Sequence, residues 1–311
     1  MAARTLRTRT MRKDKALILF SYALVYIVWG STYFFVKAAG TTIPVALVVA
    51  LRFIVGSLIL SLLAWKRGAF KQSPTLKEAA GSVLIGVFLL FLGNGLITIA
   101  VKTIPSYFAS LIAACMPFYV AFFNFMLYRT KVSRIRFSGT FLGILGIGAL
   151  LFNGTSLAGT LSPALLLAVA GALAWGFGTS IAAKLPKAKD PFLSTAIQMA
   201  AAGIGALCVG LAADPSIFSK LGQTSSWSWF GVSYLAVIGS LAMVAYNHLL
   251  AHEPSFRISS YALVNPLIAV FLGLASGEQA TPYLFLGVPL VLAGLALMLY
   301  GDALLERLRG S

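Results

Sequence analysis

Pro105–Pro117 reads PSYFASLIAACMP, and Pro254–Pro266 reads PSFRISSYALVNP. Both stretches open with Pro-Ser, carry a serine five residues after the first proline and end on a second proline, in opposite halves of the chain. Further pairs follow in the same order: Trp29-Gly30 with Trp175-Gly176, Lys37 and Pro44 with Lys184 and Pro191, and Gly139 and Gly146 with Gly287 and Gly294. An ordered set of matches spread over both halves indicates an internal duplication.

The composition excludes a soluble domain. Of the 311 residues, 59% are hydrophobic and 10% are charged, and the mean hydropathy is +0.91. A soluble protein needs more polar surface than this to cover its core. Apolar runs long enough to cross about 30 Å of hydrocarbon recur along the chain. We predict an all-α membrane protein with ten transmembrane helices, at residues 16–37, 44–65, 79–101, 106–128, 135–153, 163–183, 192–213, 227–249, 258–276 and 281–301.

The first apolar run follows a basic N-terminus, as a secretory signal core does. The run is longer than a signal core, contains several aromatic residues and has a counterpart in the second half. We therefore expect it to be the first membrane helix rather than a cleaved signal.

The basic residues predict the orientation. Twenty of the 24 lysines and arginines fall in the segments on the side of the two termini, three fall on the opposite side, and Arg52 lies within a span. Because basic loops stay in the cytoplasm, both termini are expected to be cytoplasmic. The net charge of +16 is then a topology signal and not a nucleic-acid-binding surface.

Each half holds five predicted spans. We expect a basic cytoplasmic N-terminus at 1–15, a first five-helix repeat at 16–153 and a second at 163–305. Because five is odd, the second repeat enters the membrane from the opposite side, which gives a 5+5 inverted-topology repeat. Such repeats suit alternating access, since exchanging the conformations of the halves exchanges the open side. Duplication retained for stability alone is the alternative.

Five stretches together resemble a known family: WGSTYFFVK at 29–37, LRF at 51–53, PSYFASLIAACMPFYVAFF at 105–123, PSFRISSYALVNPLIAVFLGLASGE at 254–278 and LGVPLVLAGLAL at 286–297. They resemble the EamA-type branch of the drug/metabolite transporter superfamily, over essentially the whole chain. Within it, the chain is most similar to bacterial amino acid exporters, and in particular to the aromatic amino acid group.

This resemblance implies a multi-pass protein of the bacterial inner (plasma) membrane that exports small organic solutes, most of all aromatic and apolar amino acids. It also implies a ten-helix basket. In that basket the third, fourth, eighth and ninth spans, helped by the first and sixth, surround a central cavity. The expected partners are the solute and the lipid bilayer.

Polar residues inside spans usually face protein or a water-filled cavity, and they supply the candidate site. The expected substrate-binding residues are Trp29, Asn94, Tyr107, Ser110, Trp175, Tyr246, Asn247, His248, Tyr261 and Asn265. Pro117 and Pro266 are expected hinges, since each proline frees the carbonyl one turn earlier.

For several of these residues a structural role stays open. Gly93-Asn94-Gly95 permits a kinked helix, with Asn94 either bonding the solute or capping a loosened turn. Tyr22, Tyr26, Trp29 and Tyr33 form an aromatic stripe along the first span. We expect Trp29 to face the cavity and the three tyrosines to pack against other helices. Arg52 is interpreted as structural, with binding of a substrate carboxylate as the alternative. Lys37 and Lys184 are expected to snorkel at span ends.

No acidic residue is expected at mid-membrane, where proton- and sodium-coupled transporters usually place one. Facilitated transport is therefore favoured, with weak coupling through His248 or Glu278 as the alternative. The same absence weighs against efflux of cationic drugs and against intramembrane aspartyl chemistry. Two dispersed histidines and the separated Cys115 and Cys208 predict no metal or cofactor site.

The glycines of GTFLGILGIG in the fifth span predict tight helix packing, against a partner that the sequence does not identify.

Overall fold

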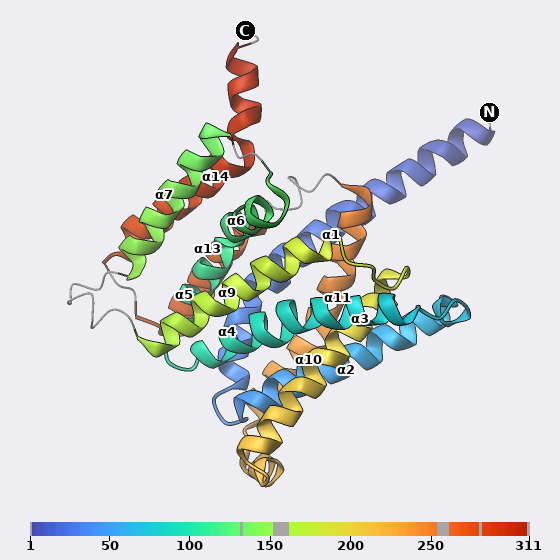
Figure 1. Cartoon of the computed structure of the whole chain (residues 1–311), viewed down its shortest axis with the longest axis vertical. Coiled ribbons are helices and arrows are strands. Elements are labelled where there is room, and N and C mark those ends of the chain that lie inside the picture. Colours follow the sequence, from blue (N-terminus) through green and yellow to red (C-terminus); the bar gives the residue numbers. More distant parts are fainter. Residues whose placement is uncertain (1, 131–132, 152–161, 254–260, 280–281, 310–311) are drawn as a thin grey trace.

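The structure is a computed structural model that describes residues 2–130, 133–151, 162–253, 261–279 and 282–309. Within these residues every regular element is helical (Figure 1). The elements are α1 (Ala2–Ala39), α2 (Val45–Lys66), η1 (Ala69–Lys71), α3 (Leu76–Gly86), η2 (Val87–Asn94), α4 (Gly95–Ala100), α5 (Ser106–Ala114), α6 (Met116–Tyr128), α7 (Arg134–Leu151), α9 (Pro163–Ala182), α10 (Pro191–Ala213), η3 (Ile217–Gln223), α11 (Ser226–His252), α13 (Tyr261–Ala275) and α14 (Leu284–Arg309).

Side-chain caps explain where several helices begin. At α3, the Thr75 hydroxyl accepts from the amide of Glu78 while the Glu78 carboxylate accepts from the amide of Thr75, which is a capping box. The Asp190 carboxylate accepts from the amide of Leu193 at the start of α10. These caps satisfy amide groups that the first helical turn leaves without intrahelical partners.

In the part of the chain that the structure describes, eight helical segments are long and apolar enough to cross a membrane: Lys15–Ala39, Val45–Lys66, Leu76–Ala100, Ser106–Tyr128, Pro163–Ala182, Pro191–Ala213, Ser226–Tyr246 and Leu284–Glu306. They overlap eight of the predicted spans. The fifth and ninth predicted spans correspond to α7 and to the shorter α13. The chain is thus a multi-pass, all-helical membrane protein, while the count of ten crossings stays a prediction.

Two of the long segments are interrupted. Between α3 and α4 the chain forms a π-helix, η2, that ends at Asn94 and so includes the first two residues of Gly93-Asn94-Gly95, while the kink expected there stays a prediction. Turns of this kind are frequent at functional sites. Between α5 and α6 the helix breaks at Cys115, two residues before Pro117. In contrast, Pro266 lies inside α13 without ending it.

The packing of the helices is reciprocal between the halves. α2 packs against α10, and α7 packs against α14, each helix meeting its counterpart by chain order. α1 packs against α11 and α13, while α9 packs against η2 with α4 and against α6. The first helix of each half therefore contacts the third and fourth segments of the other half.

Glycines bring α7 and α14 into close contact. A Cβ atom on Gly139 would lie 2.6 Å from the Met298 amide nitrogen, and one on Gly146 would lie 2.6 Å from that of Val291. Real Cβ atoms do not approach backbone atoms so closely, so only glycine fits. The tight packing expected of the fifth span is confirmed, and its partner is a helix of the same chain.

Candidate functional site

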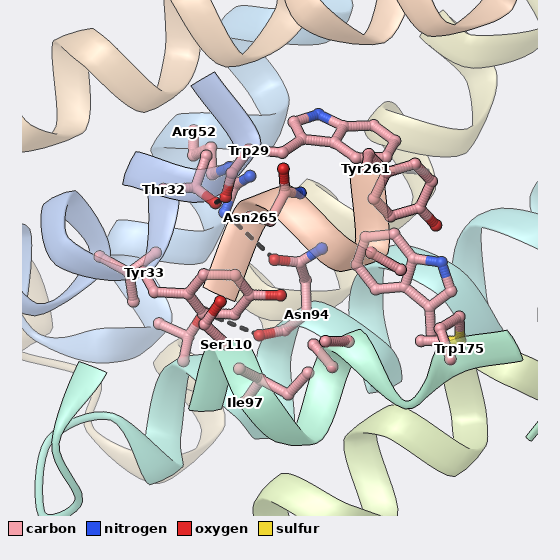
Figure 2. A pocket seen from close by; sticks show the side chains of 16 residues that line it. Trp29, Thr32, Tyr33, Arg52, Asn94, Ile97, Ser110, Trp175, Tyr261 and Asn265 are labelled. Atoms are coloured by element: carbon pink, nitrogen blue, oxygen red, sulfur yellow. Dashed lines mark hydrogen bonds between the residues drawn. The ribbon is translucent and has the colours of Figure 1, made fainter. Parts of the chain in front are cut away.

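A cavity lies among six helical segments of the bundle (Figure 2). Its walls come from α1, α2, the η2–α4 segment, the α5–α6 segment, α9 and α13. The main polar and aromatic residues on the walls are Trp29, Thr32, Tyr33, Arg52, Asn94, Thr98, Ser110, Trp175, Tyr261 and Asn265. Compared with the expected basket, α2 joins the wall, and α11 lines a smaller neighbouring cavity instead.

The cavity is small. Its volume is about 60 Å³, and the neighbouring cavity, which shares Trp29, Arg52, Asn94 and Trp175 as lining residues, measures about 30 Å³. Sites for small organic ligands commonly measure about 300–1,000 Å³. These two spaces have room for no more than a few water molecules, so their walls must separate before a larger solute enters.

Arg52 and Asn94 meet on the cavity wall. Nη1 of Arg52 donates to Oδ1 of Asn94 over 3.2 Å, and the guanidinium carbon lies 5.0 Å from the centroid of the Phe53 ring. Asn94 occupies the last position of η2, so the π-helical turn sets where its amide lies. Gly93 packs closely against α9, where a Cβ would lie 3.1 Å from Cβ of Trp175. The glycine thus serves packing, and the asparagine faces the cavity.

Aromatic rings form two sides of the cavity. The Trp29 ring lies 4.8 Å from the ring of Tyr246 and 5.1 Å from that of Tyr261, measured between centroids. Trp175, from α9, lines another part of the wall (Figure 2). Tyr33 also lines the cavity, although the aromatic stripe of the first span predicts that its ring packs. Its position one helical turn after Trp29 is the signal that identifies it.

Further polar groups line the cavity on α5 and α13. The Ser110 side chain is buried, and its hydroxyl has no hydrogen-bond partner among the residues described. In the orientation of its amide that satisfies both groups, the Asn265 nitrogen donates to two backbone carbonyls, that of Tyr261 over 3.2 Å and that of Tyr26 over 3.1 Å. Asn265 therefore ties α13 to α1 as well as lining the cavity.

Pro117 and Pro266 each leave a backbone carbonyl without its helical hydrogen bond, at positions that match between the two repeats. A proline lacks the amide hydrogen that would bond the carbonyl four residues earlier. For Pro117 that carbonyl belongs to Ala113, and for Pro266 to Ala262. Both alanines line the cavity. Each repeat thereby contributes a carbonyl without its usual helical donor at the cavity wall.

Some expected site residues lie elsewhere. Tyr107 is fully buried in the core away from the cavity lining, and its hydroxyl donates to the Gln279 carbonyl over 2.8 Å. Tyr246 is not among the lining residues, but its ring contacts two residues that are, Trp29 and Tyr261. His248 lies beside His252, with 4.2 Å between ring centroids, and is not among the lining residues. The Asn247 side chain, Pro254, Ser255, Ser259 and Ser260 lie outside the described residues.

The sequence matches a model of the EamA-like transporter family twice, over residues 16–152 and 162–300. The chain belongs to the EamA-like transporter family. It is therefore a membrane transporter of the drug/metabolite superfamily, and two copies of one family unit make up most of its length.

Curated relatives of this EamA-like transporter carry matching names. An uncharacterized inner membrane transporter of Escherichia coli K12, YedA, is 32% identical over 86% of both chains. The transporter YvbV of Bacillus subtilis is 25% identical over 89% of both chains. A solved crystal structure with 20% sequence identity superposes with a TM-score of 0.64, covering 94% of this chain and 99% of the other, and shows a shared fold.

In the EamA-like transporter, an ion pair lies next to the cavity lining of α1. Val36 lines the cavity, and the next residue, Lys37, lines a surface crevice of about 310 Å³ together with Glu278. Nζ of Lys37 lies 2.7 Å from Oε1 of Glu278, whose carboxylate also accepts from the Ser106 amide. The sequence predicts only that Lys37 snorkels at a span end, but through Glu278 it links α1 to the segment after α13 and to the start of α5.

The EamA-like transporter has a different contact at the matching position of the second repeat. Nζ of Lys184 lies 5.3 Å from the centroid of the Tyr128 ring, and the Tyr128 hydroxyl donates to the Ser180 carbonyl over 3.1 Å. These contacts join the ends of α6 and α9. Their counterparts by chain order are α13 and α1, which Lys37 and Glu278 join.

Proposed function

We propose that this protein exports small organic solutes, most of all amino acids with aromatic or apolar side chains, through its central cavity. The observation that carries the proposal is the cavity itself. Tryptophan and tyrosine rings form its apolar walls, and Arg52, Asn94 and Ser110 supply convergent polar groups. Such a combination suits a solute with a polar end and an apolar body.

The transport cycle we propose is alternating access by a 5+5 inverted repeat. The reciprocal packing of α1 with α11 and of α9 with the η2–α4 segment supports it, as does the twofold family match. In this cycle the Lys37–Glu278 contact and the Lys184–Tyr128 contact open in turn. The domain limits are those predicted, with repeats at 16–153 and 163–305.

We place the protein in a bacterial inner membrane with both termini in the cytoplasm. The name of the E. coli relative and the excess of basic residues on the terminal side support this placement.

We propose that transport is facilitated and not coupled to protons. Among the described lining residues of the cavity there is no acidic side chain. The Glu278 carboxylate, in the crevice beside Lys37, is held by Lys37 and by the Ser106 amide. Efflux of cationic drugs is disfavoured for the same reason, since the cavity presents a cation and no carboxylate to a positively charged solute.

Exchange in proteoliposomes tests the function. Vesicles loaded with single unlabelled amino acids are expected to accumulate labelled phenylalanine by counterflow. The rate should be equal with and without an imposed pH gradient. A rate that depends strongly on the gradient would contradict facilitated transport, and His248→Ala and Glu278→Gln would then identify the coupling group.

A further inference from the structure

Arg52 is a positive charge on the cavity wall without an acidic partner in the part of the chain that the structure describes. A guanidinium carries five N–H donors. The hydrogen bond to Asn94, 3.2 Å long and to a neutral amide, accounts for one of them. The other donors are available to a molecule in the cavity.

A second arginine, Arg67 at the C-terminal end of α2, provides a comparison, because it has an acidic partner within the protein. Nε of Arg67 lies 3.7 Å from Oδ2 of Asp190, and its guanidinium lies 4.7 Å from the Phe192 ring centroid. The Arg67 side chain is also 59% exposed. A charge inside a membrane protein is costly unless it is paired, so Arg52 would gain more from a counter-charge than Arg67 does.

The internal repeat does not explain Arg52 either. The matched positions of the second half hold Gln198 and Met199. Both are buried, with Met199 packed in the core between α2 and α10. The scaffold therefore accommodates an uncharged side chain at the matching position, where Met199 lines the neighbouring cavity, and the cation at this position belongs to the first half alone.

Ser110 provides a second unpaired group on the same cavity. Its side chain is 1% exposed, and its Oγ has no hydrogen-bond partner among the described residues. Buried hydroxyl groups without partners are rare, because an unsatisfied buried donor lowers the stability of the folded protein. A carboxylate in the cavity can accept hydrogen bonds both from a guanidinium and from a hydroxyl.

We propose that Arg52 binds the carboxylate of the transported solute. The substrate class is then a small carboxylate with an apolar or aromatic body, for which the ammonium group of an amino acid is optional. Amines that lack a carboxylate are excluded by the charge of Arg52. This inference rests on the proposed function only in taking the central cavity as the solute site.

Ligand binding to the purified full-length protein tests the inference without transport. The probes are L-phenylalanine, 3-phenylpropionate, which lacks the ammonium group, and phenethylamine, which lacks the carboxylate. Both carboxylates are expected to raise the thermal unfolding temperature, and phenethylamine is not. Stabilisation by phenethylamine equal to that by phenylalanine, or none by either carboxylate, would overturn the proposal.

Three variants assign the effect to Arg52. Arg52→Gln should weaken carboxylate binding at least about tenfold, because the charge-assisted bonds are lost. Asn94→Asp leaves the guanidinium in place but supplies it with an internal carboxylate, so binding should weaken comparably in a protein of nearly unchanged volume. Arg67→Gln, the matched control on the same helix, should bind as the wild type does. Unchanged binding in both Arg52→Gln and Asn94→Asp would overturn the proposal.

Counterflow separates this inference from the proposed function. Phenylalanine exchange that persists undiminished in Arg52→Gln would overturn the role of Arg52 and leave amino acid transport standing. Carboxylate binding that depends on Arg52, in a protein that exchanges no amino acid, would support the role of Arg52 and contradict the amino acid cargo.

Discussion

The ammonium group of Lys37, at the end of α1, lies 2.7 Å from the carboxylate of Glu278, beyond the end of α13. The Glu278 carboxylate is nearly buried, and it also accepts the Ser106 amide hydrogen at the start of α5. Three segments that line the cavity are thus joined through one acidic side chain. In the proposed transport cycle, these contacts separate when the cavity opens on this side.

Glu278→Gln should loosen this closure, because it removes the charge that holds Lys37. The readout is labelling of Ala113→Cys, a residue of the cavity wall, by a membrane-impermeant maleimide. The background should lack Cys115 and Cys208. We expect labelling several-fold faster than with Glu278 present.

The matched control is Asp214→Asn, which removes the acid of a different surface ion pair, with Lys220. It should leave the labelling rate unchanged. Equal rates in the Glu278→Gln and parent proteins would show that the ion pair does not close the cavity.

Trp175→Ala should weaken phenylalanine exchange by about tenfold, because an aromatic wall of the cavity is lost, whereas Trp175→Phe should retain most of it. Trp65→Ala provides the control, since that ring lies on the outer surface and is 64% exposed. The prediction is wrong if Trp175→Ala and Trp65→Ala exchange phenylalanine at the same rate.

Gly139→Ala should lower the stability of the protein in detergent by about 1–3 kcal/mol, because the added methyl group meets the backbone of α14. Gly239→Ala, in α11, has open space around the new Cβ and should be neutral or slightly stabilising. Thermal unfolding of the two variants measures the difference. Equal unfolding temperatures would contradict the close α7–α14 contact.

The contribution of Asp214 to the stability of the protein should depend on pH only under acid conditions. Hydrogen bonds from Lys220 and Ser216 lower the pKa of this carboxyl group to about 2 from its ordinary 3.8. A lowered pKa contributes stability above the ordinary value, and that contribution is lost as the pH falls from about 4 towards 2. The stability difference between the wild type and Asp214→Asn should therefore be constant from pH 5 to 8. A difference that changes within this range would contradict the assignment.

Much of the fold follows from the sequence, because the length of each apolar segment and the spacing of its glycines are local patterns that can be read from the chain. The apolar runs predicted the long helices, and Gly93-Asn94-Gly95 predicted the irregular turn that the structure places at η2. The glycines of the fifth span predicted close packing, but only the structure identifies α14 as the partner.

The site was less predictable, because it depends on how distant segments rotate against one another. Tyr107 follows the loop before α5, and no local pattern shows that its ring turns into the core and its hydroxyl to Gln279. Arg52 was interpreted as structural because its repeat mate is uncharged. A charged residue in one repeat and an uncharged residue in the other also fit a cavity that binds the polar end of a solute on one side. The pairing of Lys37 with Glu278 joins residues 241 positions apart and leaves no sequence signal.

Counterflow of labelled phenylalanine into proteoliposomes that contain the purified protein tests the central claim most directly. The account predicts rapid uptake when the vesicles hold unlabelled phenylalanine or another apolar amino acid. It also predicts loss of that uptake in Asn94→Ala and Trp175→Ala, with Trp65→Ala unaffected. No uptake above that of empty vesicles, in protein shown to be folded, would contradict amino acids as the cargo; uptake equal in all four proteins would contradict the central cavity as the pathway.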